Sequence, residues 1–435
     1  MIVIIGGGIS GLAVAWYLQK KGIEYVLLES SERAGGNILT EKTDKYLIEK
    51  GPNSLLADNE VQEIIDEIGL KDRILYPEEV SKNRYIFKDG KYRKLPAGPA
   101  FLFSDFFSFS AKLSVFKEYS NKSKGDENET VASFFERRFS KEIVDNAVNP
   151  FVSGIYAGDP KQMLIRKTFP QLFDFEREHG SIIKGFLKTK SSSGRRVSYS
   201  FHNGMQEIPD QLAKSVNIKY NSKVLAIEKG EQYLVKSTSG EYLADKVILS
   251  LPAYSAFEIL NTLPTVEISP LNNVHYPELA VIHTAFKKAD MKAVPNGFGG
   301  LHPKKAGLYT AGCMWSSCLF PVRCPEDEFL LTSFVGGSQF EKEISYNNDT
   351  VRQNVTNELK RVYEIDGEPV FQKIHRWKKS IPQYTEKIDA AHEVLERLET
   401  EDIYHTINWE GGVSIADCLK KGKALAEKIE KNMNK

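Results

Sequence analysis

Three glycines near the start of the chain have the spacing of a phosphate-binding turn. Gly6, Gly8 and Gly11 follow the apolar run 2–5 and precede a segment with the apolar periodicity of a helix. Glycines in this pattern permit a tight turn, bring backbone close to a pyrophosphate and let a helix pack closely on a strand. The helix N-terminus then faces the phosphate charge. The pattern predicts a dinucleotide-binding turn.

An acidic residue stands where such a unit places its ribose ligand. The next apolar run, residues 25–28, ends in Glu29. Glu29 follows Gly11 at close to the spacing of about 20 residues at which an acid meets the ribose hydroxyls. The strand, helix, second strand and acid are therefore all in place, which makes a chance glycine pattern the weaker interpretation.

A second glycine turn comes directly after the acid. Arg33 is followed by Ala34, Gly35 and Gly36. The arginine offers charge-assisted donors to a phosphate, and the glycines permit close backbone approach. This string resembles the second phosphate-binding turn of the large flavoprotein family that includes amine oxidases, phytoene desaturases and protoporphyrinogen oxidases. The resemblance implies FAD as a non-covalent cofactor.

Further strings support that resemblance. Glu49-x-Gly51-Pro52-Asn53 resembles the turn that runs under the flavin ring, and residues 411–414 place a glycine pair before a closing helix. Trp377 and Tyr384 are candidates for the walls of the flavin site, with core packing as an equal alternative. The cofactor-binding residues implied in total are Gly6, Gly8, Ile9, Ser10, Gly11, Glu29, Ser30, Arg33, Gly35, Gly36, Asn37, Gly51, Pro52, Asn53, Val224, Trp377, Tyr384, Gly412, Val413 and Ser414.

Strings spread over the rest of the chain resemble the protoporphyrinogen oxidase branch of this family. They lie at residues 149–160, 169–172, 319–325, 330–337 and 381–384. The resemblance implies oxidation of protoporphyrinogen IX to protoporphyrin IX in haem biosynthesis, by hydride transfer to flavin N5 with dioxygen as acceptor. Arg84 occupies the position of an arginine that pairs with a substrate propionate, and Gly154 is the second implied substrate-binding residue.

Three alternatives stay open. The substrate could be coproporphyrinogen III, whose four propionates would call for extra cations around the pocket. The chain could instead be another amine oxidase-like enzyme or a carotenoid desaturase. It could also be a flavin-binding scaffold without turnover.

No residue is assigned a catalytic role from the sequence. Flavin chemistry needs positioning rather than a catalytic triad, so His179, His202 and His375 are candidate bases by type alone and structural roles are favoured. The gaps between Cys313, Cys318 and Cys324 match no zinc site, so no metal is expected.

Composition excludes several classes of protein. Lys+Arg and Asp+Glu both number 58, so the formal net charge of the 435-residue chain is zero and no nucleic-acid partner is expected. No run of about 18 uncharged apolar residues predicts a spanning helix, and no signal peptide is expected. We expect a cytoplasmic protein, peripheral on the inner face of the cell membrane as one option, with a homodimer left open.

The predicted fold class is mixed α/β. It combines a Rossmann-like FAD-binding domain, a substrate-binding sheet domain and a helical membrane-binding subdomain. The FAD-binding parts are 1–82, 191–264 and 373–435; the helical and substrate subdomain is 83–190, and the substrate-binding domain is 265–372. The phenylalanine-rich stretch 101–109 is either an aromatic core, which is favoured, or an exposed membrane patch.

Overall fold

A five-stranded parallel sheet gathers strands from three distant parts of the chain. The computed structural model describes residues 1–433 except 97, 99, 190–195 and 264–266. The order of the sheet is β10 (Ile218–Lys219), β2 (Tyr25–Leu28), β1 (Ile2–Ile5), β14 (Lys246–Leu249) and β20 (Ile403–His405), all mutually parallel. The carboxyl ends of these strands therefore lie along one edge, where open α/β sheets bind ligands.

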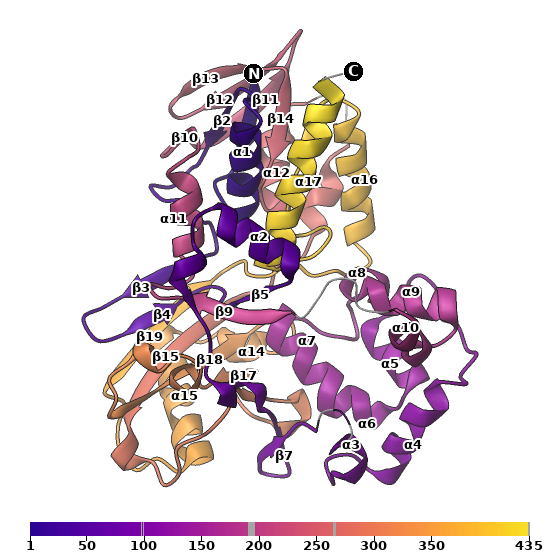
Figure 1. Cartoon of the computed structure of the whole chain (residues 1–435), viewed down its shortest axis with the longest axis vertical. Coiled ribbons are helices and arrows are strands. Elements are labelled where there is room, and N and C mark those ends of the chain that lie inside the picture. The colour runs from indigo at the N-terminus through magenta and orange to yellow at the C-terminus, as the bar shows by residue number, and fades with distance from the viewer. Residues whose placement is uncertain (97, 99, 190–195, 264–266, 434–435) are drawn as a thin grey trace.

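Helices cover both faces of this sheet, as Figure 1 shows. One face packs on α1 (Ile9–Lys20), α2 (Asn59–Glu67) and α17 (Ile415–Met433). The other packs on α12 (Ala253–Leu260) and α16 (Ile388–Glu399). Because both faces are buried, the strands are apolar throughout, as expected for parallel strands. The first and last helices of the chain thus lie side by side.

Several smaller sheets accompany the parallel sheet. The three-stranded sheet is β11 (Val224–Lys229), β12 (Tyr233–Ser237) and β13 (Gly240–Ala244). A hairpin pairs β3 (Thr40–Lys42) with β4 (Leu47–Glu49), and β9 (Val197–Phe201) pairs with β5 (Leu55–Ala57) and β6 (Ile74–Leu75). The helix α11 (Glu207–Ala213) follows β9.

A seven-stranded, largely antiparallel sheet forms the second half of the molecule. Its order is β19 (Phe371–Trp377), β15 (Leu279–Lys287), β18 (Glu328–Gly336), β17 (Gly312–Met314), β16 (Gly299–Leu301), β7 (Arg84–Lys88) and β8 (Lys91–Lys94). α15 (Asn348–Tyr363) packs on one face through a continuous apolar cluster. The opposite face of this sheet contacts the segment that follows β4, where the Trp377 indole donates to the Lys50 carbonyl.

The segment from residue 100 to 188 is helical. It contains α3 (Ala100–Phe103), α4 (Phe109–Glu118), α5 (Val131–Arg138), α6 (Lys141–Ile143), α7 (Asn149–Tyr156), α8 (Ile165–Thr168), α9 (Pro170–His179) and α10 (Ile182–Lys188). The phenylalanine-rich stretch divides between the two expected roles. Phe106 and Phe107 are 1% and 6% exposed, whereas Phe103 and Phe109 are 88% and 81% exposed. The stretch is therefore half core and half surface.

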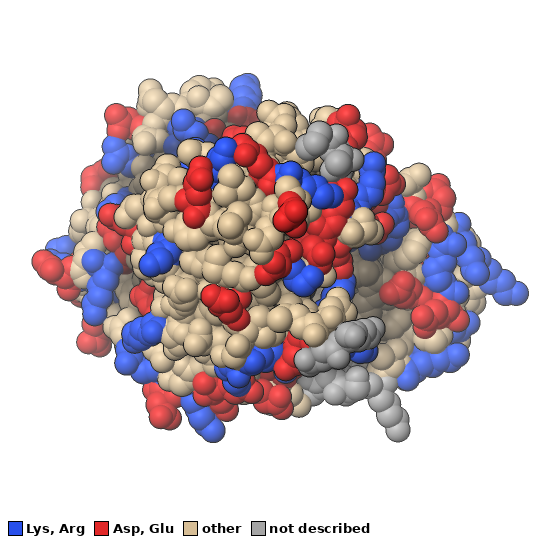
Figure 2. Space-filling view, turned by 90° about the horizontal axis from the view of Figure 1, so that it is seen from above, with Lys and Arg blue, Asp and Glu red and all other residues tan. Residues whose placement is uncertain are grey.

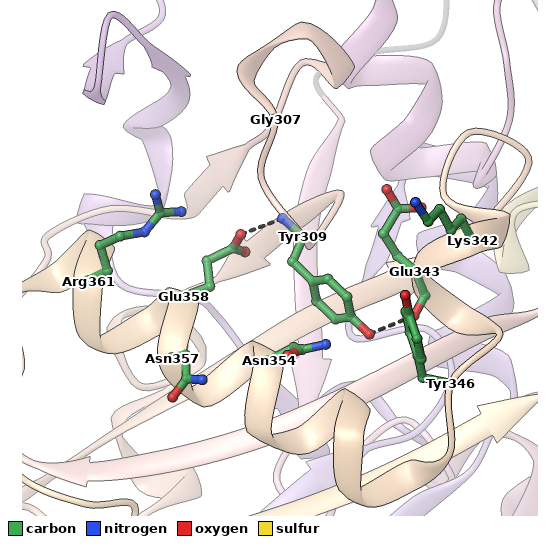
Figure 3. Close-up of a pocket in the computed structure, with 9 residues that line it drawn as sticks. All are labelled: Gly307, Tyr309, Lys342, Glu343, Tyr346, Asn354, Asn357, Glu358 and Arg361. Carbon is green, nitrogen blue, oxygen red and sulfur yellow. Dashed lines mark hydrogen bonds between the residues drawn. The ribbon is translucent and has the colours of Figure 1, made fainter.

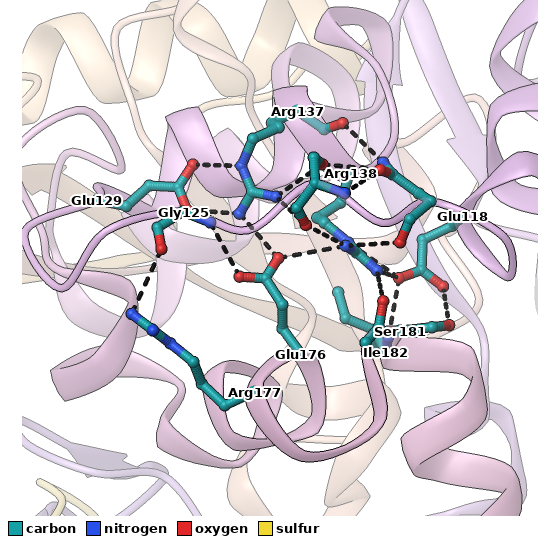
Figure 4. Close-up of polar contacts among 12 residues, drawn as sticks. Glu118, Gly125, Glu129, Arg137, Arg138, Glu176, Arg177, Ser181 and Ile182 are labelled. Atoms are coloured by element: carbon teal, nitrogen blue, oxygen red, sulfur yellow. Dashed lines mark hydrogen bonds and ion pairs between the residues drawn. The ribbon is translucent and has the colours of Figure 1, made fainter.

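A buried ionic network holds this helical segment together, as drawn in Figure 4. The Arg138 guanidinium is fully buried and pairs with Glu118 and, at 3.3 Å, with Glu176. The neighbouring Arg137 pairs with Glu176 at 2.8 Å and with Glu129 at 2.6 Å. Since buried charges are costly unless they are paired and hydrogen-bonded, this network fixes how α4, α5 and α9 pack.

The parallel sheet draws its strands from the three segments that were expected to bind FAD. Segments 1–82, 191–264 and 373–435 each contribute strands to the parallel sheet. The division at 372/373 falls inside β19, which belongs to the seven-stranded sheet as far as Trp377. The divisions at 190/191 and 264/265 both lie outside the described residues. In the described part of the chain, no helix is long and apolar enough to cross a membrane.

Candidate functional site

The three glycines of the first turn have different surroundings. Gly6 has φ +105°, and Gly11 approaches so closely that a Cβ there would lie 2.0 Å from the Gly6 carbonyl oxygen. A Cβ on Gly8 would meet no protein atom within 4 Å. The spacing therefore predicts the positions correctly: Gly6 makes the turn, Gly8 borders an open space, and Gly11 allows the helix to pack closely.

The second glycine turn lies against the first. The Gly35 amide donates to the Gly7 carbonyl at 2.8 Å, and a Cβ on Gly36 would lie 3.3 Å from the Gly8 Cα. Gly35 and Gly36 both have positive φ, +109° and +56°. The structure thus brings the two turns together at the start of α1.

Arg33 uses part of its hydrogen-bonding capacity within its own turn. Its guanidinium donates to the carbonyl oxygens of Ala34 (3.1 Å), Ile38 (2.9 Å) and Gly36 (2.6 Å). Three of the five guanidinium donors are therefore used within its own turn. Burial also lowers the pKa of Arg33, although Glu29 opposes that shift. The contacts of Arg33 shape the second turn.

Glu29 is held between the two turns at the carboxyl end of β2. Its Oε2 accepts from the Gly7 amide at 2.7 Å, and its Oε1 accepts from the amide and hydroxyl of Ser31 and, at 3.3 Å, from Ser30. One lone pair of Oε2 is left for a further donor. The Ser222 amide bonds the Glu29 carbonyl, which places the buried Val224 beside this end of the site.

The turn at residues 50–53 lies between the glycine turns and the seven-stranded sheet. A Cβ on Gly51 would lie 1.9 Å from the Asn37 carbonyl oxygen, so the two segments touch through backbone. The Trp377 indole donates to the Lys50 carbonyl at 2.7 Å. Asn53 donates weakly to the Gly51 carbonyl (3.4 Å), and Pro52 is half-buried between them.

The C-terminal glycine turn leads into α17, which begins beside the first glycine turn. Gly411 and Gly412 have φ of +63° and +104°, and Ser414 forms a reciprocal helix cap with Asp417. In the first turn of α17, the Cys418 thiol is in hydrogen-bonding contact with Ser10 of α1. Both helices therefore begin side by side, with Ile9 as the first residue of α1 and Val413 just before α17.

Tyr384 joins this turn to the helical segment. Its hydroxyl donates to the Asn408 carbonyl at 3.1 Å and faces the Gly412 amide, while its own carbonyl accepts from Leu164. Burial raises the pKa of Tyr384. The ring is fully enclosed at 2% exposure, which agrees with packing at least as well as with a flavin wall.

The face of the seven-stranded sheet opposite α15 presents a cation beside an apolar wall. The ladder aligns Arg84 with Gly299 and Met314, so their side-chain positions share this face. The Arg84 guanidinium lies 4.3 Å from the ring of Phe298, and no carboxylate of the described residues pairs with it. Its pKa is lowered by desolvation alone. The remaining wall is Leu75, Leu319, Phe320 and Phe334.

Gly154 has a neighbour other than a ligand. A Cβ on this residue of α7 would lie 2.4 Å from Leu301 of β16. The close approach that the glycine permits is therefore the packing of α7 on the sheet.

The three candidate bases are scattered. His179 stacks on Phe175, and the His202 backbone bonds Arg73. His375 lies on β19 beside Trp377, with ring centroids 4.5 Å apart, and its Nε2 has no partner among the described residues. Of the three, only His375 lies near the glycine turns, as its interaction with Arg33 shows.

A surface cavity lies elsewhere. It has a volume of about 480 Å³ and is lined by polar side chains of α14 (Glu341–Ile344), α15 and residues 307–309. Figure 3 shows Glu358 at its base, accepting from the Tyr309 amide. It lies on the α15 side of the sheet and contains no predicted site residue, so we do not assign the catalytic site to it.

The surface charge is mixed. Acidic and basic side chains alternate over the face in Figure 2, so this face has no large area of positive charge that would attract a polyanion.

Sequence reasoning missed the residues that hold the turns in place. Glu49, which precedes the turn at 50–53, accepts from Thr40, from the Met205 amide and, at 3.4 Å, from Arg323. Arg323 also donates to Ser200 at 2.5 Å. The arginine was visible in the string 319–325, but its partners lie more than a hundred residues away. Phe298 lies in none of the family-like strings, and Phe334, which lies in the string 330–337, was given no role.

The chain matches known proteins over its full length. The family model described as flavin containing amine oxidoreductase matches residues 9–429. Protoporphyrinogen oxidase 2 of Arabidopsis thaliana is 30% identical, over 98% of this chain and 93% of that protein. Coproporphyrinogen III oxidase of Bacillus subtilis (strain 168) is also 30% identical, over 97% and 96%.

Solved structures share the fold. A protein of Exiguobacterium sp. 255-15 with a provisional assignment as a protoporphyrinogen oxidase superposes with a TM-score of 0.82 at 24% identity, over 99% of this chain and 98% of that chain. A reduced UDP-galactopyranose mutase superposes with a TM-score of 0.76 at 14% identity, over 99% and 95%. The match of the family model to residues 9–429 shows that the chain belongs to the flavin containing amine oxidoreductases, and its cofactor is FAD.

Proposed function

We propose that this protein oxidises a porphyrinogen to the porphyrin, with protoporphyrinogen IX as the first candidate substrate. The observation that carries the proposal is the full-length similarity to two kinds of porphyrinogen oxidase, each 30% identical. Bound FAD supplies the hydride acceptor, and dioxygen is the proposed final acceptor of the electrons. The protein contributes binding, orientation and exclusion of water.

The residues at the glycine turns fit a flavin dinucleotide. The open space beside Gly8 lies at the N-terminus of α1, where backbone amides and the helix dipole favour a diphosphate. Glu29, with its free lone pair, fits a ribose hydroxyl. We propose that the turn at 51–53 and the segment 412–414 before α17 hold the flavin end. The first of them is bonded to Trp377 of the seven-stranded sheet, and the start of α17 contacts Ser10 beside the first glycine turn.

We propose that Arg84 binds a carboxylate of the substrate. A guanidinium that has no carboxylate partner among the described residues and lies on a phenylalanine ring is a strong donor for an incoming anion. The apolar wall of Met314, Phe320 and Phe334 lies next to it. A flat macrocycle with propionate edges matches that combination of one cation and an apolar surface.

Coproporphyrinogen III is the second candidate, because the Bacillus subtilis relative is as similar as the plant protein. The test is to incubate the purified flavoprotein in air with each porphyrinogen and to follow porphyrin fluorescence. We expect turnover of protoporphyrinogen IX to exceed that of coproporphyrinogen III. Faster turnover of the latter would transfer the assignment, and no porphyrin from either would contradict the proposal.

We propose peripheral attachment to the inner face of the cell membrane through the helical segment, in a cytoplasmic protein. Large apolar side chains are exposed on three helices of this segment, α3, α4 and α10: Leu102, Phe103, Phe109, Phe116, Phe186 and Leu187. Exposed apolar side chains of this size suit insertion into the headgroup boundary of a bilayer. A homodimer that buries the same face is the alternative. Co-sedimentation with anionic vesicles supports attachment, whereas a concentration-dependent dimer without vesicle binding supports the alternative.

A further inference from the structure

The C-terminal glycine turn is shaped by two side chains of the helix that follows it. Asp417 accepts from the Ser414 amide, and a Cβ on Gly412 would lie 2.3 Å from its carboxylate. One helical turn later, on the same face of α17, Lys421 reaches back to the segment before the turn. Asp417 thus binds an amide of the turn, and Lys421 is left to bind its carbonyls.

Lys421 collects three backbone carbonyls on one ammonium. Its Nζ donates to the carbonyl oxygens of Ile407 (2.5 Å), Gly412 (2.9 Å) and Glu410. All three donors of the ammonium are then used. A Cβ on Gly411 would lie 3.3 Å from Lys421 Cδ, so the aliphatic stem packs against the turn as well.

No carboxylate among the described residues lies within ion-pairing distance of Lys421. Burial lowers the pKa of Lys421, although Cys418, Asp417 and Glu410 oppose that shift. The ammonium is therefore satisfied by the turn itself. The carbonyls of Glu410 and Gly412 point toward Lys421, so the amides of Gly411 and Val413, which share their peptide planes, point away from it. Amides that point outward from a glycine turn are the groups that bind an anion or an oxygen edge.

The helix that bears Lys421 is fixed relative to the first glycine turn. Gly422 packs so closely on α1 that a Cβ there would lie 2.6 Å from the Ala13 Cβ, and Cys418 contacts Ser10. A side chain on α17 that sets the shape of the C-terminal turn consequently sets its position relative to Gly8 and Ser10. The two turns can then serve one ligand.

We propose that Lys421 is a positioning residue for FAD: it holds residues 407–412 in the shape that binds the cofactor, without touching the cofactor. This inference rests on the proposed placement of the flavin end at residues 412–414. Because the turn is fixed by the protein, it is preformed before FAD binds, and the affinity for FAD depends on the Lys421 ammonium.

The test compares FAD affinity among single variants of the full chain. FAD is titrated into each apo-protein and binding is read from the quenching of flavin fluorescence, with circular dichroism and cooperative thermal unfolding as checks of folding. For Lys421→Met we expect the Kd for FAD to rise at least about tenfold, equivalent to about 1.4 kcal/mol. Lys421→Gln, which keeps two donors, should fall between that variant and the wild type.

Lys420→Met is the matched control, because Lys420 is the adjacent residue and pairs with Asp58 rather than with the turn. Its Kd should stay within about twofold of the wild type. Equal affinity of Lys421→Met and Lys420→Met would overturn the inference. Failure of the wild-type apo-protein to bind FAD at all would instead overturn the proposed function.

Discussion

The two large sheets offer a ligand different chemistry. At the parallel sheet, the predicted site is built from backbone, in turns at the ends of strands and helices that contain Gly6, Gly8, Gly35 and Gly412. At the seven-stranded sheet it is built from side chains, namely Arg84 and an apolar wall. At the glycine turns an added side-chain atom therefore disturbs either the fold, as at Gly11, or the space for the cofactor, as at Gly8, whereas side chains on the substrate side can be altered without loss of the fold.

The strongest way to break this comparison is Gly11→Ala. The added Cβ would lie 2.0 Å from the Gly6 carbonyl, and because both groups are backbone, α1 would have to move off β1. We expect the free energy of unfolding to fall by about 3 kcal/mol or more, with loss of bound FAD. Thermal unfolding and flavin content of the purified variant measure both effects. A variant as stable as the wild type would contradict the packing role of Gly11.

Gly8→Ala separates cofactor binding from stability on the same turn. Its Cβ meets no protein atom within 4 Å, and its φ of −67° suits alanine, so thermal unfolding of the apo-protein should be unchanged. The methyl group would occupy the space assigned to the diphosphate, and we expect FAD to bind roughly 30-fold more weakly, about 2 kcal/mol. Titration with FAD checks this. Unchanged affinity would place the diphosphate elsewhere.

Arg84→Ala tests the side-chain character of the substrate side. We expect KM for the porphyrinogen to rise about tenfold with a smaller fall in kcat, because the lost contact with a propionate contributes equally in the ground and transition states. FAD content and thermal stability should match the wild type. Steady-state kinetics by porphyrin fluorescence give the measurement.

Lys91→Ala is its control, an exposed cation on the paired strand β8 of the same hairpin. It should leave KM unchanged. If both variants had the kinetics of the wild type, Arg84 would not bind the substrate.

The smallest expected effect concerns His283, which is buried on β15 against Glu49. Burial lowers its pKa to about 3. Between that value and the ordinary value of about 6.5, the unfolded chain binds a proton that the folded protein does not, so stability falls as the pH is lowered. From pH 7 to 5.5 we expect His283 to account for about 1 kcal/mol of lost stability. His283→Gln should show a correspondingly smaller drop in unfolding midpoint; an identical drop would contradict the assignment.

Local pattern was enough to predict the first half of the cofactor site. The order strand, Gly6 turn, helix and Glu29 follows from short-range spacing, and the structure has these elements as β1, α1 and β2. The hairpin turn at Asp89 and Gly90, both with positive φ, is equally local. Such features depend on neighbours in the sequence, which a single chain reveals.

Contacts between distant segments could not be predicted. Glu49 meets Arg323, which lies 274 residues later, only because sheets from different parts of the chain pack together. The contact of Lys421 with the carbonyls of 407–412 is closer in sequence, but it depends on the shape of the glycine turn, which spacing alone does not give. The phenylalanines of 101–109 show the same limit, since their division between core and surface depends on how α3 and α4 lie against β7. Arg33 had the right residue type, but three of its five guanidinium donors are taken by its own turn.

The most direct test of the account is to mix the purified protein with protoporphyrinogen IX in the absence of oxygen and record the visible absorbance of the bound flavin. The account predicts that the protein is isolated yellow, that the flavin band bleaches while porphyrin forms, and that air restores it. A colourless protein that takes up no FAD, or a flavin band unchanged by protoporphyrinogen IX and by coproporphyrinogen III, would contradict it.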